Sequence, residues 1–377
     1  MIINCRSTYI RMTKKSIFRE AIVVVVTAAF ISCQGQNTTE VQSAKSNTPK
    51  SVVASPDSVS DLEEGVQVIF QDSKDHIWFN GAKGVYRYDG TQLLLYTEED
   101  GLCSTGLLGI QEDQAGNLYF DTTDGVCKFD GTQFFSLEII DNTDDSDAWK
   151  LEPGDLWFRS GWNHDGPFRY DGEVLHKLKF PKSEMEDEFN ATYPNVSFNP
   201  YGIYSTYYDS DGNVWFGTSS LGLCRFDGES VQWLYERHLT ETPAGGAFGI
   251  RSIIEDDGGD FWICNTQYKY DFANSQSNQL AYNRKPGIGV PSNSGESEYP
   301  YFMSVAKDNN GDLWMATYDN GVWRKTEDEL VHYPVSNGDT DVLLFTVYCD
   351  NNGTIWLGSH NAGAFRYQED QFLPFNP

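Results

Sequence analysis

The sequence predicts an all-β fold, a seven-bladed β-propeller with four antiparallel strands per blade, over residues 62–377. Three observations lead to this prediction. A short motif around an aromatic residue recurs seven times, an apolar residue followed by a basic one comes six to eleven residues after each copy, and an Asp-Gly pair follows four of those segments. Helical repeats have similar periods, but these segments alternate and turn as strands do.

Each copy of the motif is a turn followed by a strand that carries an aromatic anchor. The clearest copy is Asp209-Ser-Asp-Gly-Asn-Val-Trp215-Phe, and the weakest, at Trp157, lacks the leading aspartate. The anchors lie about 46 residues apart on average, which suits one four-stranded blade. They are Trp78, Tyr119, Trp157, Trp215, Trp262, Trp314 and Trp356.

The rest of a blade follows from the apolar–basic pair and the Asp-Gly turn. A blade reads as strand A, the turn, strand B with the anchor, strand C with the basic residue, the Asp-Gly hairpin and strand D. Cys127 and Cys224 occupy a strand C position that is aromatic in most other blades, so we expect both to be core residues without chemistry. Five cysteines follow the N-terminal region, and an odd number without CxxC spacing argues against a zinc site or a complete disulfide framework.

The string from Asp209 to Gly228 resembles the two-component regulator propeller repeat. In that family such repeats build periplasmic sensor regions of hybrid histidine kinases, and shorter members are free-standing propellers. The resemblance therefore implies a propeller with a sensing role. Because this chain ends at the seventh blade, we do not expect kinase activity.

Residues 1–33 are predicted to be a lipoprotein signal peptide, with translation starting at Met1 or at Met12. Basic residues precede an apolar run of eleven residues, which is too short to span a bilayer. Phe30-Ile31-Ser32-Cys33 then resembles the bacterial lipobox, which implies a lipid on Cys33. A plain secretory signal is the alternative. Residues 34–61 are mostly polar, without apolar periodicity, and are expected to form a flexible tether.

The net charge of −28 excludes several kinds of partner. A sequence pI near 4.4 opposes binding to nucleic acid and adsorption of the folded body onto an anionic membrane. We therefore expect membrane attachment through the lipid anchor only, in the bacterial cell envelope, and a monomer.

Neither a metal nor a cofactor is expected. The aspartates of the turns alternate as in a calcium-binding loop, but the chain enters strand B before such a loop is complete. Signatures of zinc proteases, serine hydrolases and phosphate-binding loops do not occur.

Ligand binding is expected on the face formed by the B–C loops and the D–A connectors, because the long insertions fall there. These insertions are Leu137–Ala148, Phe180–Pro200, Glu236–Gly249 and Phe272–Pro300. Asp121 and Arg159, on adjacent blades, could instead form an ion pair. The candidate ligand-binding residues are Asn80, Asp121, Arg159, Trp162, His164, Asp319, His360 and Asn361.

Three functions remain open at this stage. The first is a sensor or interaction module that binds a small molecule, a glycan or a protein. The second is a lyase or hydrolase acting at the central channel, as in virginiamycin-type lyases, with His164 or His360 and Asp121 as catalytic groups. The third is a structural subunit of an envelope complex.

Overall fold

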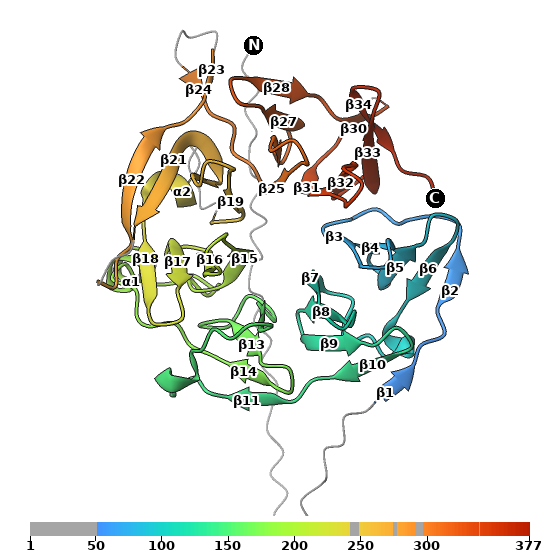
Figure 1. Cartoon of the computed structure of the whole chain (residues 1–377), viewed down its shortest axis with the longest axis horizontal. Coiled ribbons are helices and arrows are strands. Elements are labelled where there is room, and N and C mark those ends of the chain that lie inside the picture. Colours follow the sequence, from blue (N-terminus) through green and yellow to red (C-terminus); the bar gives the residue numbers. More distant parts are fainter. Residues whose placement is uncertain (1–50, 242–248, 274–276, 292–296, 339) are drawn as a thin grey trace, which may run out of the picture. The chain divides into compact units, whose positions relative to one another are not determined.

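The computed structural model describes residues 51–241, 249–273, 277–291, 297–338 and 340–377. Seven sheets surround a central axis, which confirms the seven-bladed propeller (Figure 1). The predicted signal peptide, Cys33 and the first part of the predicted tether lie outside the described residues. Within the described part, no helix is long and apolar enough to cross a membrane.

Six blades have the predicted antiparallel order, with strand A nearest the axis and strand D at the rim. In chain order their strands are β3 (Ile69–Gln71), β4 (Ile77–Asn80), β5 (Val85–Tyr88), β6 (Leu93–Tyr96); β7 (Leu107–Glu112), β8 (Leu118–Thr122), β9 (Gly125–Phe129), β10 (Gln133–Ser136); β15 (Ile203–Tyr208), β16 (Val214–Thr218), β17 (Leu223–Phe226), β18 (Val231–Leu234); β19 (Ile253–Glu255), β20 (Phe261–Ile263), β21 (Asn265–Ala273), β22 (Ala281–Pro286); β25 (Ser304–Lys307), β26 (Leu313–Ala316), β27 (Val322–Lys325), β28 (Leu330–Tyr333); and β31 (Leu344–Cys349), β32 (Ile355–Ser359), β33 (Ala364–Gln368), β34 (Gln371–Pro374). These form blades 1, 2, 4, 5, 6 and 7.

Blade 3 departs from the prediction of four antiparallel strands because it has no strand A. Its innermost strand is β12 (Leu156–Phe158), followed by β13 (Phe168–Tyr170) and β14 (Leu175–Lys177). A fourth strand, β11 (Ile139–Asp141), lies at the rim and pairs in parallel with β14. The first of the long insertions therefore builds an outer strand.

Side chains of the neighbouring blades replace the missing strand of blade 3. The backbone N–H of Trp157 donates to the Tyr208 hydroxyl of blade 4 at 3.1 Å, and its carbonyl accepts from Gln111 Nε2 of blade 2 at 2.6 Å. The backbone N–H groups of Arg159 and Ser160 donate to the Asp121 carboxylate at 2.9 and 2.8 Å. The inner edge of β12 thus has polar partners without a strand A.

The recurring motif is explained by one carboxylate that closes the turn and binds the anchor. In blade 4, Asp209 Oδ1 accepts from the backbone N–H groups of Asp211 and Asn213, and Gly212 adopts a left-handed conformation with φ of 84°. Asp209 Oδ2 accepts from the Trp215 indole at 2.7 Å. The same indole–aspartate bond, at 2.8–2.9 Å, recurs in blades 1, 5, 6 and 7. In blade 3, which lacks this aspartate, Trp157 Nε1 is buried without a partner among the described residues.

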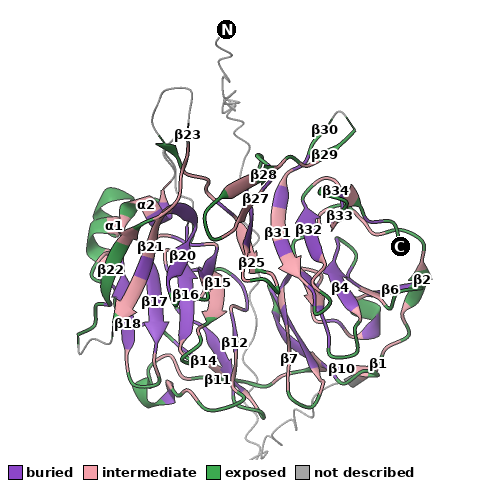
Figure 2. Ribbon diagram, turned by 45° about the horizontal axis from the view of Figure 1, so that its top comes forward, coloured by how far each residue is buried: buried purple, intermediate pink, exposed green. Residues whose placement is uncertain are grey.

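The anchors are buried and fill the interfaces between blades. Trp215 packs against Phe261 and Phe272 of the next blade, with ring centroids 4.9 and 4.7 Å apart. Figure 2 shows buried residues along strands such as β16 and β17. The basic residue of strand C lies over the anchor ring, at 5.1–6.0 Å from the centroid, in blades 1, 2, 4, 6 and 7, the bases being Arg87, Lys128, Arg225, Arg324 and Arg366.

The turn aspartates make stability depend on acid pH. Burial opposes ionisation of Asp72, but hydrogen bonds from Trp78 and His76 outweigh it and lower its pKa. Asp171 is also opposed by burial, yet bonds from Val174 and His176 lower its pKa to about 2. A carboxyl group whose pKa is lower in the folded state stabilises the fold at pH values above its ordinary pKa near 4. That stabilisation is lost as the pH falls through the lowered pKa of the folded state.

We therefore expect the free energy of unfolding, measured by urea titration, to fall between pH about 4 and about 2. Asp171→Asn is expected to flatten part of this slope. Asp121 contributes with the opposite sign, because burial raises its pKa. A flat profile across this window contradicts the prediction.

The segment before the first blade is partly ordered, so the predicted tether of residues 34–61 is wrong for residues 51–59. There β1 (Ser51–Val53) pairs with β10, and β2 (Asp57–Val59) pairs with β6, both antiparallel. Each adds a fifth strand at the rim, and the segment runs along the outside of blades 2 and 1 (Figure 1). Without this segment, the outer edges of β10 and β6 would have unpaired backbone groups. These groups form the hydrogen bonds that order the polar segment.

The ring closes through side chains, since blade 7 takes all its strands from the C-terminal end of the chain. Phe79 of blade 1 packs against Trp356 and Phe375, with centroids 5.7 and 5.6 Å apart. Gln71 adds polar contacts: its backbone N–H donates to the Tyr348 hydroxyl, and its side chain accepts from the backbone N–H of Asn351. Packing and hydrogen bonds therefore replace a shared strand at the seam.

The cysteine prediction needs a correction. Cys127 is buried, as predicted, but it forms a disulfide with Cys103, which precedes strand A of the same blade. Cys224 and Cys264 are buried and free, and Cys349 is half-buried and free. The spacing of the cysteines in the sequence did not predict this disulfide, because Cys103 and Cys127 meet only when strand C folds against the connector.

The insertions also differ from the prediction that all lie on one face. Phe180–Pro200 contains α1 (Glu186–Thr192), which has no buried residue, and the third insertion contains α2 (Arg237–Thr240). The insertion Phe272–Pro300 consists of two parts, only one of which belongs to a D–A connector. Its first part is the long C–D hairpin of β21 and β22, and its second part carries a two-stranded ribbon, β23 (Val290–Pro291) and β24 (Ser297–Glu298). A second ribbon, β29 (Ser336–Asn337) with β30 (Thr340–Asp341), precedes blade 7.

Candidate functional site

A cavity of about 460 Å³ lies where the inner strands meet the predicted binding face, and we call it the channel mouth. All seven blades contribute to it. Its lining residues are Gln67, Val68, Leu107, Leu108, Arg159, Trp162, Tyr204, Arg251, Met303, Ser304, Phe345 and Thr346.

Six lining residues share one place in the repeat, eleven residues before the anchor: Gln67, Leu108, Tyr204, Arg251, Met303 and Phe345. In three blades the strand pairing is shifted at this residue, which marks a β-bulge at Leu108, Tyr204 and Phe345. A bulge changes the direction of a side chain and leaves it out of the ladder. The sequence therefore contained a signal for these residues, a fixed offset from the anchor, which our prediction did not use.

Among the described residues, the charged side chains that line the channel mouth are two arginines, and no carboxylate lines it. This contrasts with a chain that has 55 acidic and 27 basic residues. The Arg251 guanidinium lies over the Tyr204 ring, 4.4 Å from its centroid. Burial lowers the pKa of both arginines, and the nearby charge of Arg251 further lowers that of Arg159. The described lining of the cavity thus contributes two cationic groups.

Arg159 fills the gap left by the missing strand of blade 3. Its side chain is 19% exposed and donates to the carbonyls of Leu108 in blade 2 and Tyr204 in blade 4. Its Nε lies 3.8 Å from the Asp121 carboxylate, so the alternative of an ion pair is the arrangement found. Burial raises the pKa of Asp121 despite the arginine. Asp121 does not line the cavity, and its oxygens bind the backbone of blade 3.

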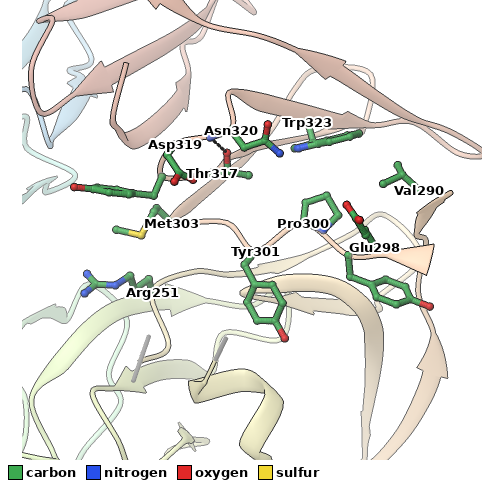
Figure 3. A pocket seen from close by; sticks show the side chains of 12 residues that line it. Arg251, Val290, Glu298, Pro300, Tyr301, Met303, Thr317, Asp319, Asn320 and Trp323 are labelled. Atoms are coloured by element: carbon green, nitrogen blue, oxygen red, sulfur yellow. Dashed lines mark hydrogen bonds between the residues drawn. The ribbon is translucent and has the colours of Figure 1, made fainter. Parts of the chain in front are cut away.

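A second cavity of about 510 Å³ lies between blades 5 and 6, and we call it the blade 5–6 groove. Arg251 and Met303 line both cavities, so the groove continues outward from the channel mouth. Figure 3 shows these two side chains at one end, with Val290 and Glu298 at the other. The remaining lining residues are Tyr299, Pro300, Tyr301, Thr317, Tyr318, Asp319, Asn320 and Trp323.

The eight predicted site residues fall into three groups. Arg159 and Trp162 line the channel mouth, and Asp319 lines the groove. Asn80 and Asn361 hold connectors by hydrogen bonds to backbone groups. His164 packs against Phe168, and His360 against Phe345; neither lines either cavity, and neither does Asp121.

The acid–histidine pair of the lyase hypothesis is therefore not assembled in either cavity. Asp121 is occupied by backbone donors and by Arg159. Across the described ranges, no group of three or more histidine, cysteine, aspartate or glutamate side chains is placed to hold a metal ion.

Comparisons with known proteins place this geometry among propellers. Residues 197–220 match the family model described as two component regulator propeller. A comparison with curated protein sequences found no match. The matched segment includes the clearest copy of the recurring motif, Asp209 to Thr218, and so agrees with the resemblance noted in the sequence.

Two similar solved structures are extracellular domains from B. thetaiotaomicron, of proteins described as the hybrid two component systems BT4673 and BT3049. They share 19% and 17% identity with this chain, each with a TM-score of 0.54. The alignments cover 83% and 84% of this chain, which spans about 40% of those chains. Virginiamycin B lyase from Staphylococcus aureus matches at 13% identity over 82% of this chain and 97% of the lyase, with a TM-score of 0.55. At these identities the likeness establishes the propeller fold.

Proposed function

We propose that this propeller is an extracytoplasmic ligand-binding module whose site is the channel mouth, and that its ligand carries a negative charge. One observation carries the proposal: in the part of the chain that the structure describes, Arg159 and Arg251 are the charged residues that line the cavity, and no carboxylate lines it, although the chain is strongly acidic. The many carboxylates elsewhere on the protein repel an anion. An anionic ligand is therefore expected to bind where arginines converge. Trp162, Tyr204 and Phe345 offer aromatic surface for the rest of the ligand.

Its place outside the cytoplasm is supported by the Cys103–Cys127 disulfide, since such bonds persist in oxidising compartments. A lipid on Cys33 would hold it in the bacterial cell envelope. The likeness to extracellular domains of proteins described as two component systems supports a sensing role. The ligand-bound propeller would then report to a partner in the envelope.

The experiment is a thermal-shift and calorimetric screen of the purified protein. The panel contains small carboxylates, phosphates, and acidic and neutral oligosaccharides. We expect anionic compounds to raise the melting temperature, and Arg251→Gln to weaken their binding about tenfold or more. Arg237→Gln is the matched control, because that arginine is exposed, pairs with Glu241 and lines neither cavity.

Equal shifts with neutral sugars, or unchanged binding by Arg251→Gln, would contradict an anion site. If no compound shifts the protein, the role of a structural subunit in an envelope complex gains support. A pull-down from envelope extracts tests that role directly.

A further inference from the structure

We propose that the ligand is a short peptide, with its C-terminal carboxylate at the channel mouth and a cationic group in the blade 5–6 groove. This inference rests on the proposed function, because it takes the channel mouth as the anion site. It adds a second subsite of opposite charge and a class of ligand.

The two subsites form one continuous path. Arg251 and Met303 belong to both linings, so a ligand atom that leaves the arginines enters the groove directly. Tyr318 joins them as well, because it lines the groove and its ring lies 5.9 Å from that of Phe345 at the channel mouth. Each cavity is within the range of about 300–1,000 Å³ that small ligands occupy.

The groove has the charge opposite to that of the channel mouth. Asp319 comes from the B–C loop of blade 6 and Glu298 from β24, and both are exposed. Neither carboxylate forms an ion pair or hydrogen bond with any residue in the described part of the chain. Figure 3 shows Asp319 nearer to Met303 and Glu298 at the outer end. A cation moving outward from Arg251 therefore meets one carboxylate and then a second.

Aromatic and hydrogen-bonding groups complete the groove. Trp323, Tyr299 and Tyr318 supply aromatic surface, and an ammonium or guanidinium binds well to such rings beside carboxylates. Trp323 stacks on His332 at 4.5 Å, which fixes its ring. Its buried Nε1 has no partner among the described residues.

These charges favour a peptide over an acidic oligosaccharide. A sugar acid that satisfied the arginines would extend its further carboxylates toward Asp319 and Glu298, where like charges repel. A peptide with a free C-terminus and a lysine or a free amino end places opposite charges at its two ends. The arginines of the channel mouth face the carboxylate end of such a peptide, and the carboxylates of the groove face its cationic end.

The test uses isothermal calorimetry on the purified full chain with the tripeptide Lys-Ala-Ala. Two altered peptides accompany it: the C-terminal amide, and an N-acetylated peptide with norleucine in place of lysine. We expect each change to weaken binding about tenfold. Asp319→Asn is expected to weaken Lys-Ala-Ala but to leave the uncharged-end peptide unchanged. Asp328→Asn, an exposed carboxylate of the same blade outside both cavities, is the control.

The outcomes separate this inference from the proposed function. If Arg251→Gln weakens all free carboxylates but Asp319→Asn has no effect on Lys-Ala-Ala, the peptide proposal is overturned and the anion site stands. An acidic oligosaccharide that binds more tightly than Lys-Ala-Ala, or no binding of the tripeptide up to about 1 mM, overturns it too. If Arg251→Gln changes nothing for any carboxylate, the anion site itself is wrong.

Discussion

Replacing Asp121 with alanine is expected to lower the free energy of unfolding by about 3–5 kcal/mol. Asp121 is buried, and its two oxygens accept from the backbone N–H groups of Arg159 and Ser160. Its removal leaves these donors and the Arg159 charge without their acceptor in a blade that lacks strand A. Urea denaturation followed by tryptophan fluorescence measures the loss.

A double-mutant cycle makes this prediction specific. Asp121→Ala combined with Arg159→Met should cost clearly less than the sum of the single changes, because no unpaired charge then remains buried. Asp124→Ala, in the exposed loop that follows β8, is the control and should stay within about 0.5 kcal/mol of the native protein. Strict additivity would show that the two side chains act independently.

Replacing Trp215 with alanine is expected to cost about 3–5 kcal/mol as well. The side chain is fully buried, contacts Phe261 and Phe272 across the interface of blades 4 and 5, and donates to Asp209. The cavity would open a seam between two blades, so the ring as a whole should loosen. Thermal unfolding by calorimetry is the measurement.

Trp162→Ala is the matched control for Trp215, because the same residue type is 45% exposed at the channel mouth. We expect it to leave stability nearly unchanged. Trp215→Phe should fall between the two, since it keeps an aromatic ring but loses the bond to Asp209. Equal destabilisation by both alanine variants would mean that the anchors are not what holds the blades together.

The irregular blade and the candidate site have a common origin. Because blade 3 has no strand A, Arg159 extends across the gap and contacts carbonyls of blades 2 and 4. Trp162 of the same blade also lines the channel mouth. The structural exception in the repeat therefore supplies one of the two cations on which the proposed function depends.

Much of the fold could be predicted from single repeats. The leading aspartate, the turn glycine and the anchor aromatic lie within a few residues of one another, and their contacts are local. The weak copy at Trp157 lies in the blade that lacks strand A, for which the repeat had predicted four antiparallel strands. Trp162 and Asp319, from B–C loops, and Arg159, from the end of a strand B, lie on the predicted face, and these three line the cavities.

Other parts of the site could not be assigned in this way. Asn80 and Asn361 have the polarity of binding residues, but each has an amide oxygen that accepts from backbone N–H groups of a connector. Arg251 was missed although it lies at the shared offset of eleven residues before the anchor, because that offset by itself does not show which side chains meet. Only the convergence of seven inner strands brings it beside Arg159 and Tyr204.

The sequence by itself determined the number of blades, the anchor of each blade and the face that carries the cavities, because these follow from residues close together within one repeat. The tertiary structure alone decided the seam between blades 7 and 1, the Cys103–Cys127 bond, the rim strands of residues 51–59 and the pairing of Asp121 with blade 3. Those contacts join residues whose separation along the chain has no regular period, so they form only when the strands and blades pack against one another.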